Sequence, residues 1–328
     1  MRCCVYTRSF NEDPYLYFFI EHYISLGFDK IIILKADNNK INLGNYYNYV
    51  EIYYVENLEN RLLPIHTNKV VKYDWVLSID IDEILLINNN NIKEYINERL
   101  EIDKNINIFY FRWGILEKYD NSNINNLINL TKQYNIYEND HIKTMAKGNL
   151  IKSIWHPHLM ELNVKPYIFF ENKILETNKP NNHPISIVSY KKSILIHLHT
   201  RSLNNLVIKA FTTRLGFHGR NTIQKKIKNI HNFIKLINEP SNYELLQNFR
   251  KVIGFKADKP FVHSKANKIK YFDFKINHYE NDLIENQKEE ELIEKIFIEN
   301  NINIKEYYKK CNEIGTNTQN NFKKNQDN

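Results

Sequence analysis

The first 86 residues alternate between short apolar runs and helical patterns, and this order constrains the fold more than any other feature. The apolar runs, rich in β-branched residues, cover residues 3–7, 30–34, 50–55 and 75–86. Asp13-Pro14 is a typical helix start and Gly27 a typical helix end. Strands and helices in close succession are typical of a parallel sheet covered by helices. The sequence therefore predicts an α/β fold with a mostly parallel, Rossmann-like sheet.

Three polar loops follow the predicted strands, at residues 8–13, 37–40 and 80–83. Because parallel strands carry their carboxyl ends to one edge of the sheet, these loops are expected to lie side by side. Ligands of open α/β sheets bind at that edge. The pattern outlines a nucleotide site.

The run from Trp75 to Leu86 reads as one buried strand that ends in the acids Asp80, Asp82 and Glu83. Side chains alternate along a strand, so Asp80 and Asp82 are expected to share a face. Two close carboxylates repel unless a cation or proton lies between them, and Mg²⁺ and Mn²⁺ prefer such oxygen ligands. Solvated acids at a strand exit are the simpler interpretation.

A second pair of candidate ligands is His197 and His199, two positions apart on a predicted strand. Imidazole is a common ligand of transition metals, although both could be ordinary polar residues of a half-buried strand. His156, His158 and His183 adjoin prolines and are interpreted as loop residues near an acceptor.

The net charge of +7 comes from Lys and Arg residues that are spread along the chain. This distribution does not favour nucleic-acid binding and suits an anionic substrate. No apolar run approaches the roughly 20 residues that span a bilayer, and the N-terminus already reads as a strand. Cys3, Cys4 and Cys311 show no metal-binding spacing and are expected to be reduced. These features predict a cytoplasmic protein without a transmembrane segment; nothing indicates its oligomeric state.

Several motifs in order resemble the GT-A glycosyltransferases of the family 2 and family 92 type, over roughly residues 1 to 220. The motifs are Asn11-Glu12, Pro14-Tyr15, Glu21-His22, Leu26-Gly27-Phe28-Asp29, Asp37-Asn38, Trp75-Val76 with Ile79-Asp80-x-Asp82-Glu83, Lys152-Ser153-Ile154 with Pro157, and His197 with Arg201-Ser202 and Lys209. The resemblance implies a GT-A fold, a mixed and mostly parallel sheet flanked by helices.

The resemblance also implies roles. Asp37 hydrogen-bonds the base or ribose of a nucleotide sugar, and Asp80 lies near the ribose or the metal-bound water. Asp82 ligates Mn²⁺ or Mg²⁺, with Asp80 and His197 in the same metal site. The cation neutralises the diphosphate as the glycosidic bond breaks.

Three basic residues are candidates for contacts to the donor. The resemblance implies that Arg201 and Lys209 hold the pyrophosphate, with Arg201 standing where the family has Lys. Arg8 follows the first strand, where it could bind base or phosphate, or form a surface salt bridge.

The catalytic base has several candidates. Inverting transfer needs a carboxylate that deprotonates the acceptor hydroxyl. Glu117 and Asp120 follow the strand that ends at Trp113, where the chain departs from the family pattern; Asp140 and Glu161 are equal alternatives. Trp113 could stack on a sugar or belong to the core.

Residues 1–221 are predicted to form the GT-A domain, residues 222–311 a helical C-terminal region and residues 312–328 a disordered tail. The charged helical pattern near residues 281–310 packs on its own domain or, less commonly, docks a partner.

The expected function is transfer of a sugar from a donor, most simply UDP-linked, to a glycan, lipid or protein hydroxyl. Two alternatives remain. One is an inactive GT-A-like carbohydrate-binding or scaffold protein. The other is an Asp-x-Asp phosphohydrolase of the haloacid dehalogenase type, whose acids follow the first strand.

Overall fold

The computed structural model describes residues 1–10, 12–37, 39–55, 68–89, 91–116, 136–154, 158–170, 173–176, 193–198, 208, 282–299, 303 and 305. The elements in chain order are β1 (Cys3–Ser9), α1 (Asp13–Ser25), β2 (Lys30–Lys35), η1 (Gly44–Tyr46), β3 (Val50–Tyr54), β4 (Trp75–Ser78), β5 (Glu83–Ile87), α3 (Ile92–Ile102), β6 (Ile108–Leu116), β7 (Ile136–Lys147), η2 (Gly148–Leu150), β8 (Ile151–Ser153), β9 (Glu161–Leu162), β10 (Tyr167–Phe170), β11 (Lys173–Glu176), β12 (Ser193–His197) and α8 (Asp282–Glu299).

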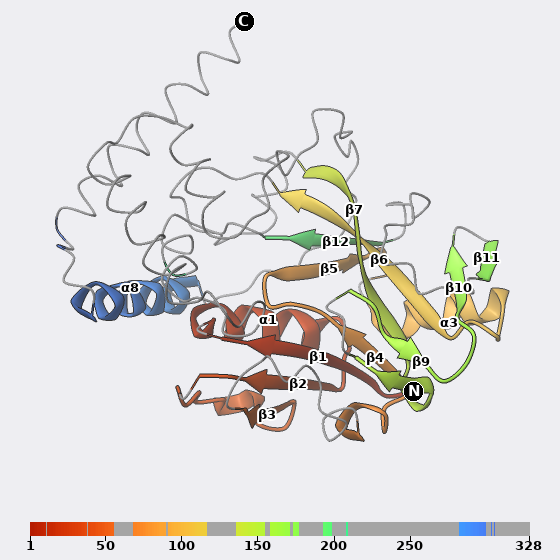
Figure 1. The fold of residues 1–328 in the computed structure, drawn as a ribbon, viewed down its shortest axis with the longest axis horizontal. Helices are drawn as coiled ribbons and strands as arrows, with labels where there is room; N and C mark the ends of the chain where they lie inside the picture. Colours follow the sequence, from red (N-terminus) through yellow and green to blue (C-terminus); the bar gives the residue numbers. More distant parts are fainter. Residues whose placement is uncertain are drawn as a thin grey trace, which may run out of the picture.

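One mixed sheet organises the molecule (Figure 1). Its first half, in the order β3-β2-β1-β4, is parallel throughout. β7 then runs antiparallel between β4 and β6. β12 lies between β5, to which it is antiparallel, and β6, to which it is parallel. The predicted fold class, an α/β fold with a Rossmann-like and mostly parallel sheet, is confirmed.

The predicted beginning of the chain is confirmed element by element. β1, β2 and β3 occupy the expected apolar runs, with β1 continuing two residues further than predicted. Pro14 lies in the first turn of α1. After this helix Gly27 adopts a φ of 87°, a conformation that favours glycine. Residues 68–70 are helical and precede a turn that leads into β4.

The single strand predicted over residues 75–86 is wrong. The chain forms β4, turns at residues 79–82 and continues as β5. β4 pairs with β1 and β7, whereas β5 pairs with β12. Local sequence cannot show this break, because apolar residues continue on both sides of the acids. The acids therefore lie in a turn between two strands, and strand alternation does not set their directions.

Apolar clusters cover both faces of the sheet. On one face, residues of α1 and α3 such as Phe19 and Ile96 pack against β1, β4 and β6. On the other face, Val70, Tyr73 and Met160 pack against a second set of strand residues. Cys3 and Cys4 are buried, and burial raises the pKa of the Cys3 thiol to about 12. This agrees with reduced, unreactive thiols.

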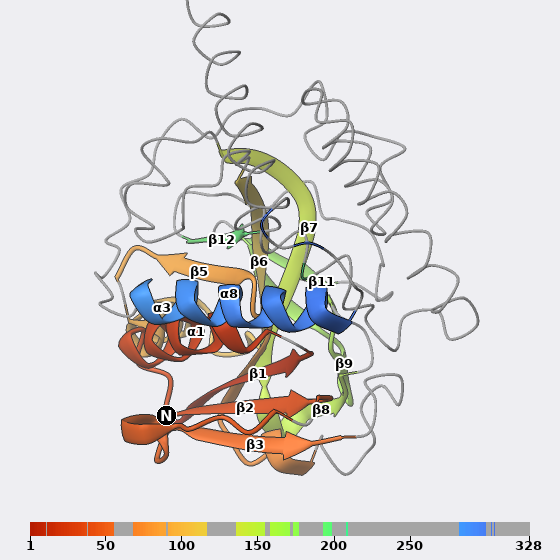
Figure 2. The ribbon, with the colours of Figure 1, turned by 90° about the vertical axis from the view of Figure 1, so that its left-hand side faces the viewer.

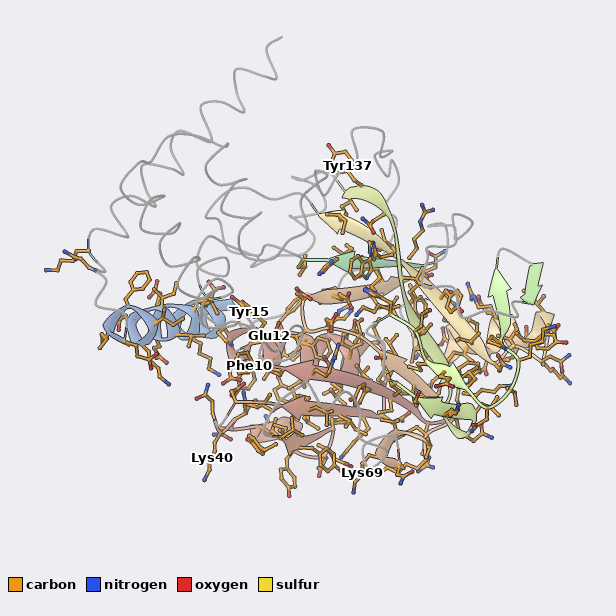
Figure 3. The ribbon with its side chains drawn as sticks, viewed as in Figure 1. Phe10, Glu12, Tyr15, Lys40, Lys69 and Tyr137 are labelled. Carbon is orange, nitrogen blue, oxygen red and sulfur yellow. The ribbon has the colours of Figure 1, made fainter. Side chains whose placement is uncertain are left out.

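The C-terminal helix α8 lies alongside α1 (Figures 1 and 2). The Tyr15 hydroxyl donates to Glu289 Oε1 at 2.5 Å, and the Lys288 ammonium lies 3.8 Å from the centre of the Tyr17 ring. Figure 3 shows Tyr15 and Glu12 at the start of α1, close to α8. Helix α8 therefore packs on the domain that contains the sheet, which is the first of the two predictions for the pattern near residues 281–310. The predicted domain boundaries at residues 221 and 311 lie outside the described residues.

None of the helices in the described part of the chain is both long and apolar enough to cross a bilayer.

Candidate functional site

The turn after β4 gathers the three acids of the Asp-x-Asp-Glu motif. The backbone N–H of Glu83 donates to Asp80 O at 3.1 Å, and the N–H of Asp80 donates to Glu83 Oε2 at 2.8 Å. Two reciprocal hydrogen bonds thus close residues 80–83 into a tight loop. The loop lies at the carboxyl end of β4, the edge at which the sequence predicts a ligand.

Helix α1 holds the strand that leaves this loop. The Tyr23 hydroxyl donates to Glu83 O at 3.0 Å and accepts from Leu85 N at 3.1 Å. His22 Nε2 lies 2.8 Å from Leu85 O, to which it donates. Both side chains are buried. The motif pair Glu21-His22 therefore belongs to the helix that fixes β5 beneath the acids.

Asp80 faces two cations. The Lys143 ammonium, from β7, lies 2.6 Å from Asp80 Oδ2 and 3.3 Å from Glu83 Oε2. Arg8 Nη2, from β1, lies 3.8 Å from Asp80 Oδ1. Burial raises the pKa of Glu83 well above its ordinary value, and the charge of Lys143 opposes that rise. Arg8 thus forms a half-buried ion pair with Asp80, a predicted site residue, and not a salt bridge on the open surface.

Asp82 faces a histidine instead. Asp82 Oδ2 lies 3.4 Å from His197 Nε2, and both side chains are buried. β12 brings them together, because His197 is paired with Glu83 across the β5–β12 ladder. The N–H of Leu198 also donates to Asp82 O at 2.7 Å. Two predicted metal ligands from distant parts of the sequence are therefore neighbours.

Trp113 of β6 packs beside the pair of Asp82 and His197. Its ring centroid lies 4.2 Å from that of His197, 4.9 Å from that of His141 and 5.1 Å from that of His158. Burial lowers the pKa of His158 to about 3, and the nearby charge of Lys143 acts in the same direction. Trp113 is buried, which agrees with the core interpretation of this residue.

A second charged group lies at the end of β2. The fully buried ammonium of Lys35 forms ion pairs with Asp13 and Asp37. Asp37 Oδ1 also accepts from the N–H of Asn39 at 3.1 Å. Because β1 lies between β2 and β4, Asp37 and Asp80 follow strands on either side of it. The predicted nucleotide residues Arg8, Asp37 and Asp80 thus share one sheet edge.

The donor set can be compared with the needs of a divalent cation. Among the described residues, no three His, Cys, Asp or Glu side chains are grouped to hold a metal. Two adjacent ligands of an octahedral ion with bonds of about 2.1 Å lie about 3 Å apart. The 3.4 Å between Asp82 Oδ2 and His197 Nε2 is close to this spacing. Mg²⁺ in such sites keeps waters and takes further oxygens from substrate phosphates, so two protein ligands fit a site that a diphosphate completes.

Several predicted site residues lie outside the described residues. They are the base candidates Glu117 and Asp120, the pyrophosphate candidates Arg201 and Lys209, and the histidines His156, His183 and His199. Asp140 lies in β7. Glu161 Oε1 accepts from Lys152 at 2.5 Å and its Oε2 accepts from Ser153 at 2.9 Å, an exposed ion pair on the small sheet.

Sequence reasoning missed the two buried lysines, Lys35 and Lys143. Each ends or interrupts a run of buried strand residues, and each bridges two acids. A lysine is almost never fully buried unless it is paired, so a lysine within the run Ile142 to Ala146 was the available signal. This signal could have indicated that the lysine is paired with an acid, but it could not have identified that acid.

Comparison with known proteins gives little. No protein-family model and no curated protein matches the chain. Among the solved structures that match is the mannosyltransferase Ktr4p from S. cerevisiae in complex with GDP, with 8% identity and a TM-score of 0.22. The match covers 36% of this chain and 41% of that one, less than half of its length. At this TM-score the likeness carries no argument about donor or reaction.

Proposed function

We propose that the chain is a metal-dependent glycosyltransferase that moves a sugar from a nucleotide-sugar donor to a hydroxyl group of a glycan, lipid or protein. The observation that carries this proposal is the pairing of Asp82 with His197. Their side chains lie 3.4 Å apart beside the carboxyl end of β4, which is parallel to β1, and α/β folds bind nucleotides at this edge of the sheet.

In this proposal Asp82 and His197 hold Mn²⁺ or Mg²⁺, which neutralises the diphosphate and stabilises it as the leaving group. Asp37 and Arg8 contact the nucleotide from the ends of β2 and β1. Asp80 lies next to Arg8, with which it forms an ion pair, near the ribose. Arg201 and Lys209 remain the predicted contacts to the pyrophosphate.

UDP as the donor nucleotide and inversion at the sugar carbon rest on the resemblance to the family 2 and family 92 enzymes. Inversion requires a base at the acceptor hydroxyl. Glu117 and Asp120 are the first candidates, because they follow β6, the strand that carries Trp113.

The first experiment is calorimetric titration of UDP, with GDP for comparison, into wild type and Asp82→Ala, each with and without Mn²⁺. We expect binding that needs Mn²⁺ and that Asp82→Ala weakens about hundredfold or more, since removal of a ligand costs at least as much as loss of its supporting contacts. Asp103→Ala, which removes an acid at the end of α3, is the matched control and should bind as wild type does.

Hydrolysis of a panel of nucleotide sugars then identifies the donor. Nucleotide binding that ignores both Mn²⁺ and Asp82 would contradict a metal-dependent transferase. An absence of binding by every nucleotide would favour the inactive scaffold.

A further inference from the structure

The most unusual residue of the site is Lys143, whose side chain is 1% exposed. It lies in β7, which pairs with β4 on one side and β6 on the other, so the backbone that carries it is fixed. A charge removed from water is stable only beside opposite charges and hydrogen-bond partners. Asp80 at 2.6 Å and Glu83 at 3.3 Å meet that need.

Among the contacts between described residues, the two aspartates of the motif lie beside different groups. Asp80 directs Oδ2 at Lys143 and Oδ1 at Arg8, whereas Asp82 directs Oδ2 at the imidazole of His197. An ammonium and a divalent cation compete for a carboxylate oxygen, because both need its lone pairs and they repel each other at short range. Histidine does not compete in this way, since neutral imidazole is itself a metal ligand.

We propose that Lys143 is the internal counter-ion of Asp80 and Glu83, and that it thereby leaves the divalent cation to Asp82 and His197. This inference rests on the proposed function, in which the acids serve a metal site. It makes Lys143 a positioning residue: the ammonium fixes the Asp80 carboxylate toward Arg8 and the nucleotide, and removes it from the metal's ligand set.

The test measures the affinity for Mn²⁺ alone from the electron paramagnetic resonance signal of the free ion. The proteins are wild type, Asp80→Asn, Asp82→Asn, Lys143→Met and the double variant Lys143→Met/Asp80→Asn. Lys147→Met is the matched control, because Lys147 ends the same strand and donates to the Lys104 carbonyl, outside the site.

We expect Asp82→Asn to lose Mn²⁺ binding and Asp80→Asn to change the affinity less than about threefold. Lys143→Met should bind Mn²⁺ about tenfold more tightly, because the Asp80 carboxylate becomes available to the ion. The double variant should lose that gain, and Lys147→Met should match wild type. If Lys143→Met does not fold, the Asp80→Asn arm decides the question.

Equal loss of Mn²⁺ by Asp80→Asn and Asp82→Asn overturns the role of Lys143 and leaves the proposed function standing. Binding of Mn²⁺ by Lys143→Met but not by wild type supports the counter-ion role. No Mn²⁺ binding by wild type or by Lys143→Met overturns the counter-ion proposal, whereas the proposed function is decided by the titration of UDP with and without Mn²⁺.

Discussion

At the scale of single residues, His22 couples the fold to pH. Its side chain is buried in α1 and donates to Leu85 O. Burial lowers the pKa of His22 from 6.5 to about 4, because the charged imidazolium is excluded from water in the folded protein. Between pH 4 and 6.5 the His22 side chain is therefore largely protonated in the unfolded chain and largely neutral in the folded protein.

The free energy of unfolding should therefore fall as the pH drops from 6.5 to 4, with a contribution from His22 of about 3 kcal/mol. Above pH 6.5 this contribution is fully present and constant. His22→Gln retains a donor for Leu85 O but does not titrate, so the difference in stability between the two proteins should change over this window. Urea denaturation at a series of pH values measures it, and parallel pH profiles would refute the assignment.

At the scale of elements, α1 holds β5 beneath the acids through Tyr23 as well as His22. The Tyr23 hydroxyl bridges two backbone groups of β5, one of them the carbonyl of Glu83. This single side chain links the helix to the loop that carries Asp80 and Asp82. Loss of the hydroxyl should loosen the loop without opening a cavity.

Tyr23→Phe should lower the free energy of unfolding by about 2 kcal/mol, since it leaves a buried carbonyl and N–H without their partner. Tyr17→Phe on the same helix removes an exposed hydrogen bond to Asn42 O and should cost less than about 0.5 kcal/mol. Chemical denaturation compares the two. An equal cost for both variants would show that the bridge to β5 contributes nothing special.

Helices and strands could be predicted where the local sequence pattern determines them. They could not be predicted where pairing with a strand distant in the sequence determines them. The periodicity of residues 3–55 indicated β1, α1, β2 and β3 nearly to the residue. The break at residues 79–82 depends on β12, which pairs with β5 from more than a hundred residues away. The pairing of Asp82 with His197 followed from the family resemblance, whereas the role of Lys143 needed the fold, because its partner Asp80 lies 63 residues earlier in the sequence.

At the scale of the whole molecule, α8 ties the end of the described chain to its beginning. Ile293 and Phe297 are buried on this helix, and Tyr15 near the N-terminus donates to Glu289. Since α8 packs on α1 and α1 packs on the sheet, we expect the three to unfold together.

Phe297→Ala should lower the free energy of unfolding by about 3 kcal/mol, through lost apolar burial and the cavity that remains. Ile298→Ala, one residue further and 78% exposed, should cost less than about 0.5 kcal/mol. Far-UV circular dichroism reports all helices, and tryptophan fluorescence includes the signals of Trp75 and Trp113 in the sheet. Transitions that do not coincide would show that α8 unfolds separately.

The place of β12 between β5 and β6 has a consequence for synthesis of the protein. β5 and β6 leave the ribosome long before residues 193–197 do. Until then, the strand edges of β5 and β6 that pair with β12 remain unpaired. Unpaired edges of this kind are where nascent chains associate wrongly. The strand that closes them also delivers His197 to Asp82. A growing chain thus acquires its candidate cation site at the same moment at which these two apolar strand edges are covered.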